Sequence, residues 1–408
     1  MRKWLLIISL FLSCVLAQAQ RDSLKLSYSV QGTVVDASSG KALESVHVLI
    51  PGKHLATVTN ADGFFVIKSN QPIPSVSVSC LGYKTRVVKV IVAENSPLKI
   101  ALKREVIEIP EASVISGNPR AIVEAAVERI WNTYCTDPEL LDCFYRETLQ
   151  KRSRYIYVAE AVARMYKSRY DGAIYRDAAA LEKSRVLVSQ RRSDTLSVKT
   201  QGGPALALNW DLVKNTEFLF SPREMDNYRY ELLPHAFIGD RLQFVVKMTP
   251  AEVTPYPLYN CLLYIDCEQL TFTRLEASMD MSDLNKATQQ MLISKPKGLR
   301  FTPEECTIQV NYRLENGKIR MQYFRSTMRF ACDWRKRLFR THYTAVNELV
   351  VTDVREKAIP IPSKERFRST EYLSEKAGEF YDADFWADFI IIEPSESLEN
   401  AIKRLRKQ

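Results

Sequence analysis

The chain has 408 residues, a hydrophobic content of 46% and a formal net charge of +9. This length excludes a single small domain, since one domain typically has roughly 100–200 residues, and the hydrophobic content is sufficient for packed cores. Basic residues are spread along the chain, apart from a cluster at 335–337 and the C-terminal tail. We therefore expect a solvated basic surface and no nucleic acid partner.

The first residues have the pattern of a cleavable secretory signal. A short basic start precedes an apolar stretch over residues 4–12, and Ala17 and Ala19 supply the small residues that a signal peptidase reads. The stretch is shorter than the roughly 20 residues of a spanning helix. We predict that residues 1–19 are a signal peptide and that the mature chain is exported, to the periplasm or the outer membrane, without a transmembrane helix.

The cysteines leave two questions open. Cys14 follows a small residue near the end of the apolar stretch, so lipid anchoring at Cys14 is an alternative to cleavage after Ala19. Cleavage after Ala19 leaves an odd number of cysteines, which cannot all pair within the chain. No Cys-x-x-Cys occurs, so the sequence indicates neither a zinc knuckle nor a redox pair.

Residues 26–103 are predicted to form a small all-β module. Polar and apolar residues alternate from Tyr28 to Asp36, as a half-buried strand requires. Further strands are expected over 46–50, 64–67, 76–80, 85–92 and 98–102. Short strands separated by turn signals at intervals of roughly 8–12 residues indicate a sandwich.

The same segment resembles the carboxypeptidase regulatory-like domain over about a fifth of the chain. The resemblance lies in linked short motifs, each weak alone: Gly32 to Asp36, Gly40 to Leu43, Val46 to Val48, Thr59 to Phe65, and Gly82 to Lys84. Asn60 stands where the family more often has Asp. The resemblance implies a seven-stranded-type, transthyretin-like (prealbumin-like) sandwich, often grouped with carbohydrate-binding-like folds, and an accessory role without a peptidase site.

Residues 104–118 are predicted to be a linker that ends in one more strand, and residues 119–408 a second domain. Asn118 suits the N-cap of a helix and Pro119 its first position, and apolar residues then recur at three- and four-residue spacing as far as Trp131. A closing helix is expected after Pro394, with acidic residues first and basic residues last.

Between these helices, β-branched and aromatic residues predominate from Cys143 to about Val350. Asn316-Gly317 is a strong hairpin signal, and residues 204–214 suit a short helix. Residues 160–170 fit either a strand or a helix. We expect a chain that is mainly β with some α, in which the second domain is α+β with a large curved antiparallel sheet.

This second region also resembles a broad set of uncharacterised bacterial envelope proteins in which it follows such a sandwich. Two stretches carry the resemblance, the helix leading into residues 143–147 and the closing stretch over 381–394. The resemblance implies placement in the cell envelope and brings no assigned activity.

The sequence offers no catalytic residue, no metal ligand set and no cofactor site. The histidines, His47, His54, His235 and His342, have no metal-spaced partner. Ser38-Ser39-Gly40-Lys41 formally matches Ser-x-x-Lys, but it falls in a turn and lacks an accompanying Lys-Thr-Gly. We interpret the histidines as surface or satisfied residues and the serine motif as a chance match.

Two clusters near the C-terminus have a functional interpretation beside a structural one. Asp382 and Asp384 could pair on a cation, but the rest of a calcium loop is missing, which favours a solvated turn. The aromatic residues of this region suit either a sugar-stacking surface or core packing, and we favour packing. They are Phe380, Tyr381, Phe385, Trp386 and Phe389.

We therefore predict a non-catalytic cell-envelope protein with a binding or structural role. Its sandwich is expected to be accessory, and its sheet domain to bind an apolar or a glycan ligand. The sequence identifies no partner, and an envelope protein, a lipid and a glycan all stay open. Two alternatives remain, an envelope hydrolase using carboxylates that the sequence does not reveal and a small outer-membrane β-barrel with an N-terminal sandwich.

Overall fold

The computed structural model describes residues 28–91, 96–105, 118–194, 199–200, 203–315, 317–334, 340–368, 371, 373–376 and 386–407. Several expectations lie outside these residues: those for the signal peptide with Cys14, the strand closing the linker, Asn316, the basic cluster at 335–337, Asp382, Asp384, Phe380, Tyr381 and Phe385. No helix within the described ranges is long and apolar enough to cross a bilayer.

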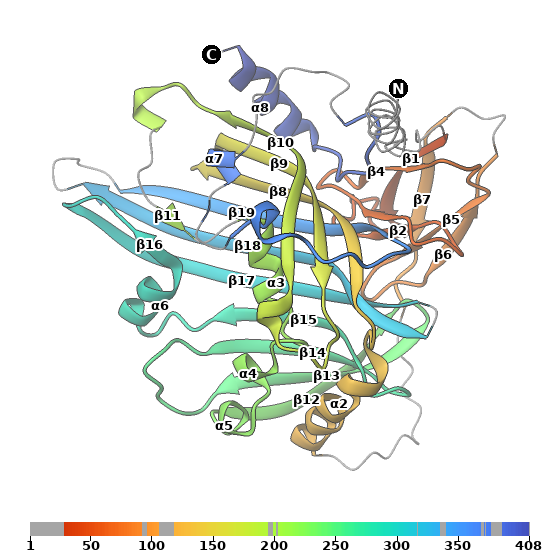
Figure 1. Cartoon of the computed structure of the whole chain (residues 1–408), viewed down its shortest axis with the longest axis horizontal. Helices are drawn as coiled ribbons and strands as arrows, with labels where there is room; N and C mark the ends of the chain where they lie inside the picture. The colour runs from red at the N-terminus through yellow and green to blue at the C-terminus, as the bar shows by residue number, and fades with distance from the viewer. Residues whose placement is uncertain are drawn as a thin grey trace, which may run out of the picture.

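The N-terminal module is a sandwich of two small sheets, coloured red to orange in Figure 1. One sheet has the order β4-β1-β7, built from Phe64–Ser69, Tyr28–Asp36 and Leu98–Leu102. The other has the order β3-β2-β5-β6, built from Ala56–Val58, His47–Leu49, Ser75–Ser79 and Arg86–Lys89. Alternate apolar side chains, among them Val34, Val48, Phe65 and Val76, meet between the sheets. The expected seven-stranded sandwich is confirmed.

A large antiparallel sheet dominates the rest of the molecule, with the order β10-β9-β8-β19-β18-β17-β15-β14-β13-β12. Its strands are β8 Glu139–Lys151, β9 Arg154–Lys167, β10 Ala178–Val188, β12 Tyr228–Ile238, β13 Arg241–Pro250, β14 Tyr259–Asp266, β15 Phe272–Met279, β17 Leu299–Glu315, β18 Lys318–Trp334 and β19 Thr341–Val354. Pairing of β19 with β8 joins the early and late strands into one sheet. The described edge strands β10 and β12 do not pair with each other, so the sheet is open, which contradicts the alternative of strands closed on themselves.

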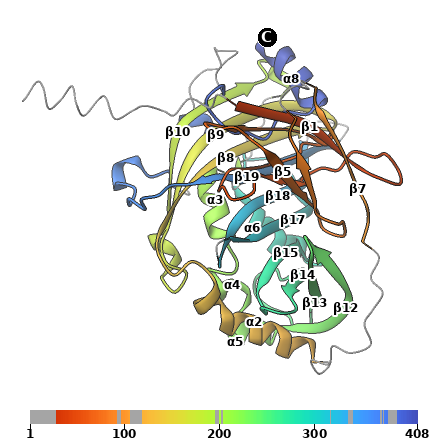
Figure 2. The ribbon, with the colours of Figure 1, turned by 90° about the vertical axis from the view of Figure 1, so that its right-hand side faces the viewer.

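Helices fill the inner face of this sheet, which bends around α3 and α6 in Figure 2. The helices of the inner face and its rim are α2 Pro119–Thr133, α3 Pro204–Asn209, α4 Thr216–Leu219, α5 Pro222–Met225 and α6 Leu284–Met291. Leu206 and Met291 join one apolar core with strand residues such as Val246 and Phe330. About 20 Å³ of space remains beside α3 and α6. A cavity of this size has room for about one water molecule, so the inner face is a packed core.

The outer face of the sheet is covered by the sandwich and by the C-terminal segment 386–395, which leads into α8, Glu396–Arg406. Val58 of the sandwich, Trp386 and Ile391 of this segment, and Tyr323 and Val350 of the sheet form one apolar cluster. The segment also bonds to the sandwich: Thr57 Oγ1 donates to the Ile391 carbonyl at 2.9 Å and Asn60 Nδ2 to the Pro394 carbonyl at 3.0 Å. The C-terminal segment therefore fastens the sandwich to the sheet.

The described helices at both ends of the second region confirm the capping signals. Asn118 accepts hydrogen bonds from the first backbone amides of α2, and Ser395 does the same for α8. The expected short helix is α3, and the ambiguous segment 160–170 lies largely in β9. The sequence did not predict β3, α4, α5 or α6, because each is short and takes its apolar contacts from distant strands.

A buried charge triad lies where the C-terminal segment meets the sheet. Arg146, Glu160 and Arg185 are cross-strand neighbours on β8, β9 and β10, and all three are buried. The Glu160 carboxylate lies 2.6 Å from Arg146 Nη2 and 2.7 Å from Arg185 Nη2. Burial alone would raise the pKa of Glu160, but the two guanidinium groups outweigh it and lower that pKa. Arg146 Nη2 also donates to the Ile392 carbonyl at 2.5 Å, so the triad anchors the segment.

We expect Arg146→Ala to lower the free energy of unfolding by about 3–5 kcal/mol, because it breaks a buried pair and removes the donor to Ile392. Backbone amide exchange in residues 391–393 should rise at the same time. Urea denaturation and hydrogen exchange measure the two effects. As the control, Arg120→Ala removes a partly exposed ion pair and should cost less than about 1 kcal/mol. Equal losses in the two variants would contradict the anchoring role.

Candidate functional site

A groove of about 650 Å³ separates the sandwich from the outer face of the sheet. Leu49 on β2 and Ser79 on β5 lie on the sandwich side, and Arg274 on β15 and Asn311 on β17 lie on the sheet side. The groove therefore exists only because the two parts of the chain are packed together. Its size falls within the range of about 300–1,000 Å³ that is usual for sites binding small molecules.

A second hollow of about 620 Å³ continues the groove along the outer face of β13, β14, β15, β17 and β18. Arg274, Gln309 and Arg325 line both hollows. Strand register explains this, because Gln309 is the cross-strand partner of Glu276 on β15 and of Arg325 on β18. The two hollows together make one extended surface of polar and apolar side chains, which we call the outer groove.

Carboxylates hold the arginine side chains of the outer groove in place. Arg274 Nε donates to Glu276 at 2.6 Å, and Arg325 Nη1 donates to Glu44 of the sandwich at 2.7 Å. A third guanidinium, that of Arg241, is bound by Asp266. The acidic residues of the groove thus serve as partners of its arginines.

His47 lies in the groove as a neutral ring. Asn311 Nδ2 lies 2.7 Å from its Nε2, and an amide N–H can only donate, so the ring accepts at this nitrogen. Burial, followed by the charges of Arg274 and Arg313, lowers the pKa of His47 to about 3. His47 is therefore a neutral hydrogen-bond acceptor in the wall of the groove.

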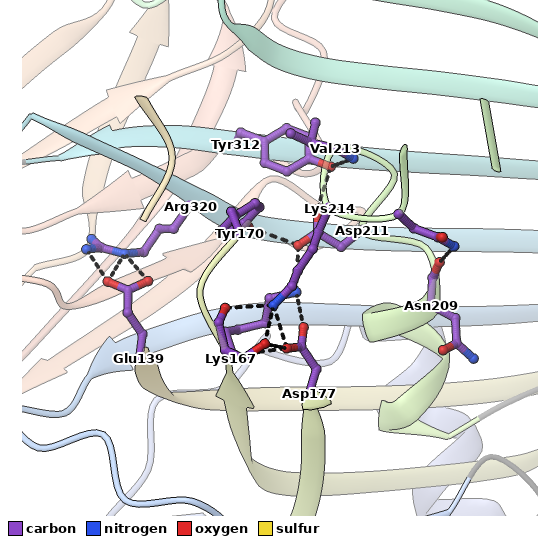
Figure 3. A network of polar contacts seen from close by, with 12 residues as sticks. Glu139, Lys167, Tyr170, Asp177, Asn209, Asp211, Val213, Lys214, Tyr312 and Arg320 are labelled. Carbon is purple, nitrogen blue, oxygen red and sulfur yellow. Dashed lines mark hydrogen bonds and ion pairs between the residues drawn. The ribbon is translucent and has the colours of Figure 1, made fainter. Parts of the chain in front are cut away.

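A second polar assembly, shown in Figure 3, is closed to solvent. Lys167 Nζ lies 2.9 Å from Asp177 and 2.7 Å from Asp211, and Lys214 Nζ lies 2.6 Å from Asp177. These four side chains are no more than 2% exposed. Tyr312 on β17 donates to Asp211 at 2.9 Å. The network joins β9, the start of β10, the α3–α4 connection and β17, so its arrangement is that of a structural cross-link.

The charges of this network balance each other. Burial alone would lower the pKa of Lys167, but the carboxylates of Asp177 and Asp211 outweigh it and raise that pKa. Likewise, burial would raise the pKa of Asp177, but Lys167 and Lys214 lower it. Both signs of charge are therefore kept ionised in the core. Because water and ligands cannot reach the network, we do not treat it as a binding site.

The other histidines also have structural surroundings. His54 Nδ1 lies 2.7 Å from Glu315 and His342 Nδ1 lies 2.8 Å from Glu304. The ring of His235 packs against Phe244, with 5.2 Å between centroids. The described residues contain no group of three or more His, Cys, Asp or Glu side chains arranged to hold a metal ion. The seven cysteines of the described ranges are free thiols.

The remaining candidates are held in structural contacts. The Asp36 carboxylate accepts hydrogen bonds from the backbone amide of Ser38 at 2.9 Å and from Tyr83 at 2.7 Å, which makes the Ser-x-x-Lys match part of a turn. Trp386 is buried against Phe144, with 5.7 Å between ring centroids, and Phe389 packs edge-on to Trp386. These two aromatic residues therefore pack against the sheet and each other.

Comparison with known proteins bears on the sandwich. Residues 30–114 match the family model described as the CarboxypepD_reg-like domain. The sandwich is a CarboxypepD_reg-like domain. This agrees with the resemblance found in the sequence motifs. The search of curated proteins found no match for the chain.

Solved structures with some likeness to this chain overlap with it only weakly. One is a domain of a putative outer membrane lipoprotein-sorting protein from Vibrio parahaemolyticus, with 13% identity, a TM-score of 0.26, and coverage of 58% of this chain and 93% of that one. Another is a LolA superfamily protein from Nitrosomonas europaea, with 14% identity, a TM-score of 0.22, and coverage of 62% and 99%. A DUF1329 family protein from Desulfovibrio piger has 8% identity, a TM-score of 0.25, and coverage of 58% and 92%. At such TM-scores, these likenesses carry no argument about what the chain binds.

The residues of the outer groove were missed by sequence reasoning. Arg274, Gln309 and Arg325 sit at solvent-facing positions of strands whose alternate residues are buried. This alternation could have placed them on one face of the sheet. The sequence gives no sign that three strands bring them together, or that the regulatory-like sandwich encloses them.

We expect Asp177→Asn to lower the free energy of unfolding by about 3–5 kcal/mol, because two buried ammonium groups would then share one carboxylate. Combining it with Lys214→Met should recover part of the loss, since the charges balance again. Urea denaturation followed by tryptophan fluorescence measures both. As a control, Asp171→Asn affects an exposed pair with Arg169 and should cost less than about 1 kcal/mol. A double variant with a lower free energy of unfolding than Asp177→Asn alone would contradict the balance of charges in this network.

His47 should make the protein sensitive to mild acid. In the unfolded chain a histidine takes up a proton below about pH 6.5, whereas the folded chain resists protonation until about pH 3. Stability is therefore lost as the pH falls through this window. We expect His47→Gln to flatten the dependence of the urea midpoint on pH between about pH 7 and pH 4.5. The exposed His342→Gln is the matched control, and an unchanged slope in His47→Gln would refute the assignment.

Proposed function

We propose that the protein is a non-catalytic cell-envelope protein and that it binds a glycan in the outer groove. The observation that carries this proposal is the groove itself, an extended hollow lined by amides, hydroxyls and arginines among apolar side chains. The sandwich and the sheet build one part of it jointly, and the sheet alone lines the other. The proposal assigns the sandwich a direct part in the site, since Leu49 and Ser79 line it.

The two faces of the sheet support a polar ligand over an apolar one. Among the described residues, helices and side chains fill the inner face beside α3 and α6, and a smaller hollow of about 240 Å³ lies at its rim near α4 and α5. The outer groove instead carries side-chain amides and hydroxyls, which both donate and accept hydrogen bonds. Asn260, Ser278, Thr307 and Thr327 all line it, and within the described residues their side chains make no hydrogen bond to protein. Sugar hydroxyls need partners of this kind.

Placement in the envelope is part of the proposal. It rests on the secretory pattern of residues 1–19 and on the motifs that resemble envelope proteins. In the same way, we propose residues 26–103 and 119–408 as the two domains, with the groove between them. Fractionation of cells, with antibody detection of the mature chain, tests the placement.

Ser79→Trp should abolish glycan binding by the purified mature protein. Ser79 lines the groove, and its side chain has no hydrogen bond to lose within the described residues, so the indole adds bulk where the ligand would lie. The measurement is binding to an array of neutral and acidic glycans, on which we expect at least a tenfold weaker signal than for the wild type. Ser75→Trp, on the same face of β5 but outside the groove lining, should bind as the wild type does.

The proposal fails in three ways. The wild type binding no glycan on the array, or Ser79→Trp binding as well as the wild type, would reject the groove as the site. Turnover of peptide, ester or glycoside substrates by the wild type would reject the non-catalytic role.

A further inference from the structure

We propose that the ligand of the outer groove is an acidic glycan, whose carboxylate groups are bound by Arg274 and Arg325. This inference rests on the proposed function and adds the charge of the ligand to it. Guanidinium groups bind a carboxylate more strongly than they bind the neutral hydroxyl of a sugar.

The two arginines have donors to spare. Arg274 uses Nε for Glu276, and within the described residues its Nη1 and Nη2 have no protein acceptor. Arg325 uses Nη1 for Glu44 and Glu348, and within the described residues its Nε and Nη2 also have no protein acceptor. Both side chains are partly exposed, at 19% and 27%. A guanidinium that is held by carboxylates through one nitrogen, with further N–H groups open to a ligand, is suited to binding another carboxylate.

The groove wall holds further unpaired polar atoms. Arg313 and Thr271 both line the groove. The Nη1 of Arg313 and the Oγ1 of Thr271 are buried and have no hydrogen-bond partner within the described part of the chain. Thr271 is only 1% exposed. Both atoms lie behind the groove surface and are closed to solvent, so they do not by themselves mark a ligand position.

Basic residues outnumber acidic ones on the walls of the two hollows. Five basic residues line them, against three acidic ones. Outside the lining, Glu348 also pairs with Arg325, and Glu315 with Arg313. An anion would therefore be bound through the guanidinium N–H groups that these pairs leave open and not through a net positive field.

The spacing of the two arginines indicates an extended ligand with more than one acidic group. Arg274 on β15 is opposite Asn311 on β17, and Arg325 on β18 is opposite Gln309, two residues away on β17. Standard strand spacing and rise place their Cα atoms about 12 Å apart. Between them, Gln309 and Asn311 present amides to the same surface. A chain of acidic sugars can place a carboxylate at each end of this stretch and hydroxyls between.

Isothermal titration of the purified mature protein with tetragalacturonate and with neutral maltotetraose tests the inference. We expect the wild type to bind tetragalacturonate at least tenfold more tightly than maltotetraose, with an affinity that falls as NaCl is added. Arg274→Gln and Arg325→Gln should each weaken tetragalacturonate binding at least tenfold. Arg329→Gln is the matched control, because Arg329 lies on β18 outside both hollows and is 56% exposed; it should change the affinity less than twofold.

The outcomes separate this inference from the proposed function. If both tetrasaccharides bind equally, Ser79→Trp blocks them and the arginine variants do not, the acidic ligand is wrong while the groove stands. If tetragalacturonate binds but Ser79→Trp has no effect, the groove itself is wrong. Failure of tetragalacturonate to bind, or equally tight binding of poly-L-glutamate, also overturns the inference. The urea midpoint of each variant checks that it is folded. If Arg274→Gln does not fold, the affinity of Arg325→Gln for tetragalacturonate tests the inference alone.

Discussion

A wide sheet exposes two faces, and the structure depends on covering both of them. The ten-stranded sheet buries its inner face under helices that belong to its own connections, and part of its outer face under the sandwich and the C-terminal segment. Apolar burial on both sides is the main source of stability for such a layered fold. The sandwich is therefore also part of the cover of the sheet, which explains why apolar residues such as Val58 face the sheet.

Covering the sheet also buries charged side chains, and each such group has its counter-charge. Glu160 lies between Arg146 and Arg185 under the C-terminal segment, and Lys167, at the end of the same strand, lies between Asp177 and Asp211. Buried ion pairs contribute little net stability compared with apolar side chains, but they permit only one arrangement of the strands that carry them. In this protein they fix where the C-terminal segment and the α3–α4 connection sit.

The outer groove is the part of the outer face that this cover leaves open. Its arginines are held by carboxylates from neighbouring strands and from the sandwich, which orients them without neutralising all their donors. A preoriented set of donors beside a rigid sheet binds a polar ligand with little loss of side-chain entropy. Cover of the sheet and formation of the site are thus consequences of the same packing between the two parts of the chain.

The sequence by itself determined the local features: the sandwich strands and their turns, the cap at Asn118, the closing helix after Pro394, and the strand-rich character of the second region. These depend on residues close together in the chain, through alternation, capping and turn chemistry. Only the tertiary structure decided that Arg274, Gln309 and Arg325 share one surface, that Asp211 pairs with Lys167, and that helices fill the inner face. Each of these depends on which strands become neighbours, and that is set by the burial of the whole sheet, which no local pattern records.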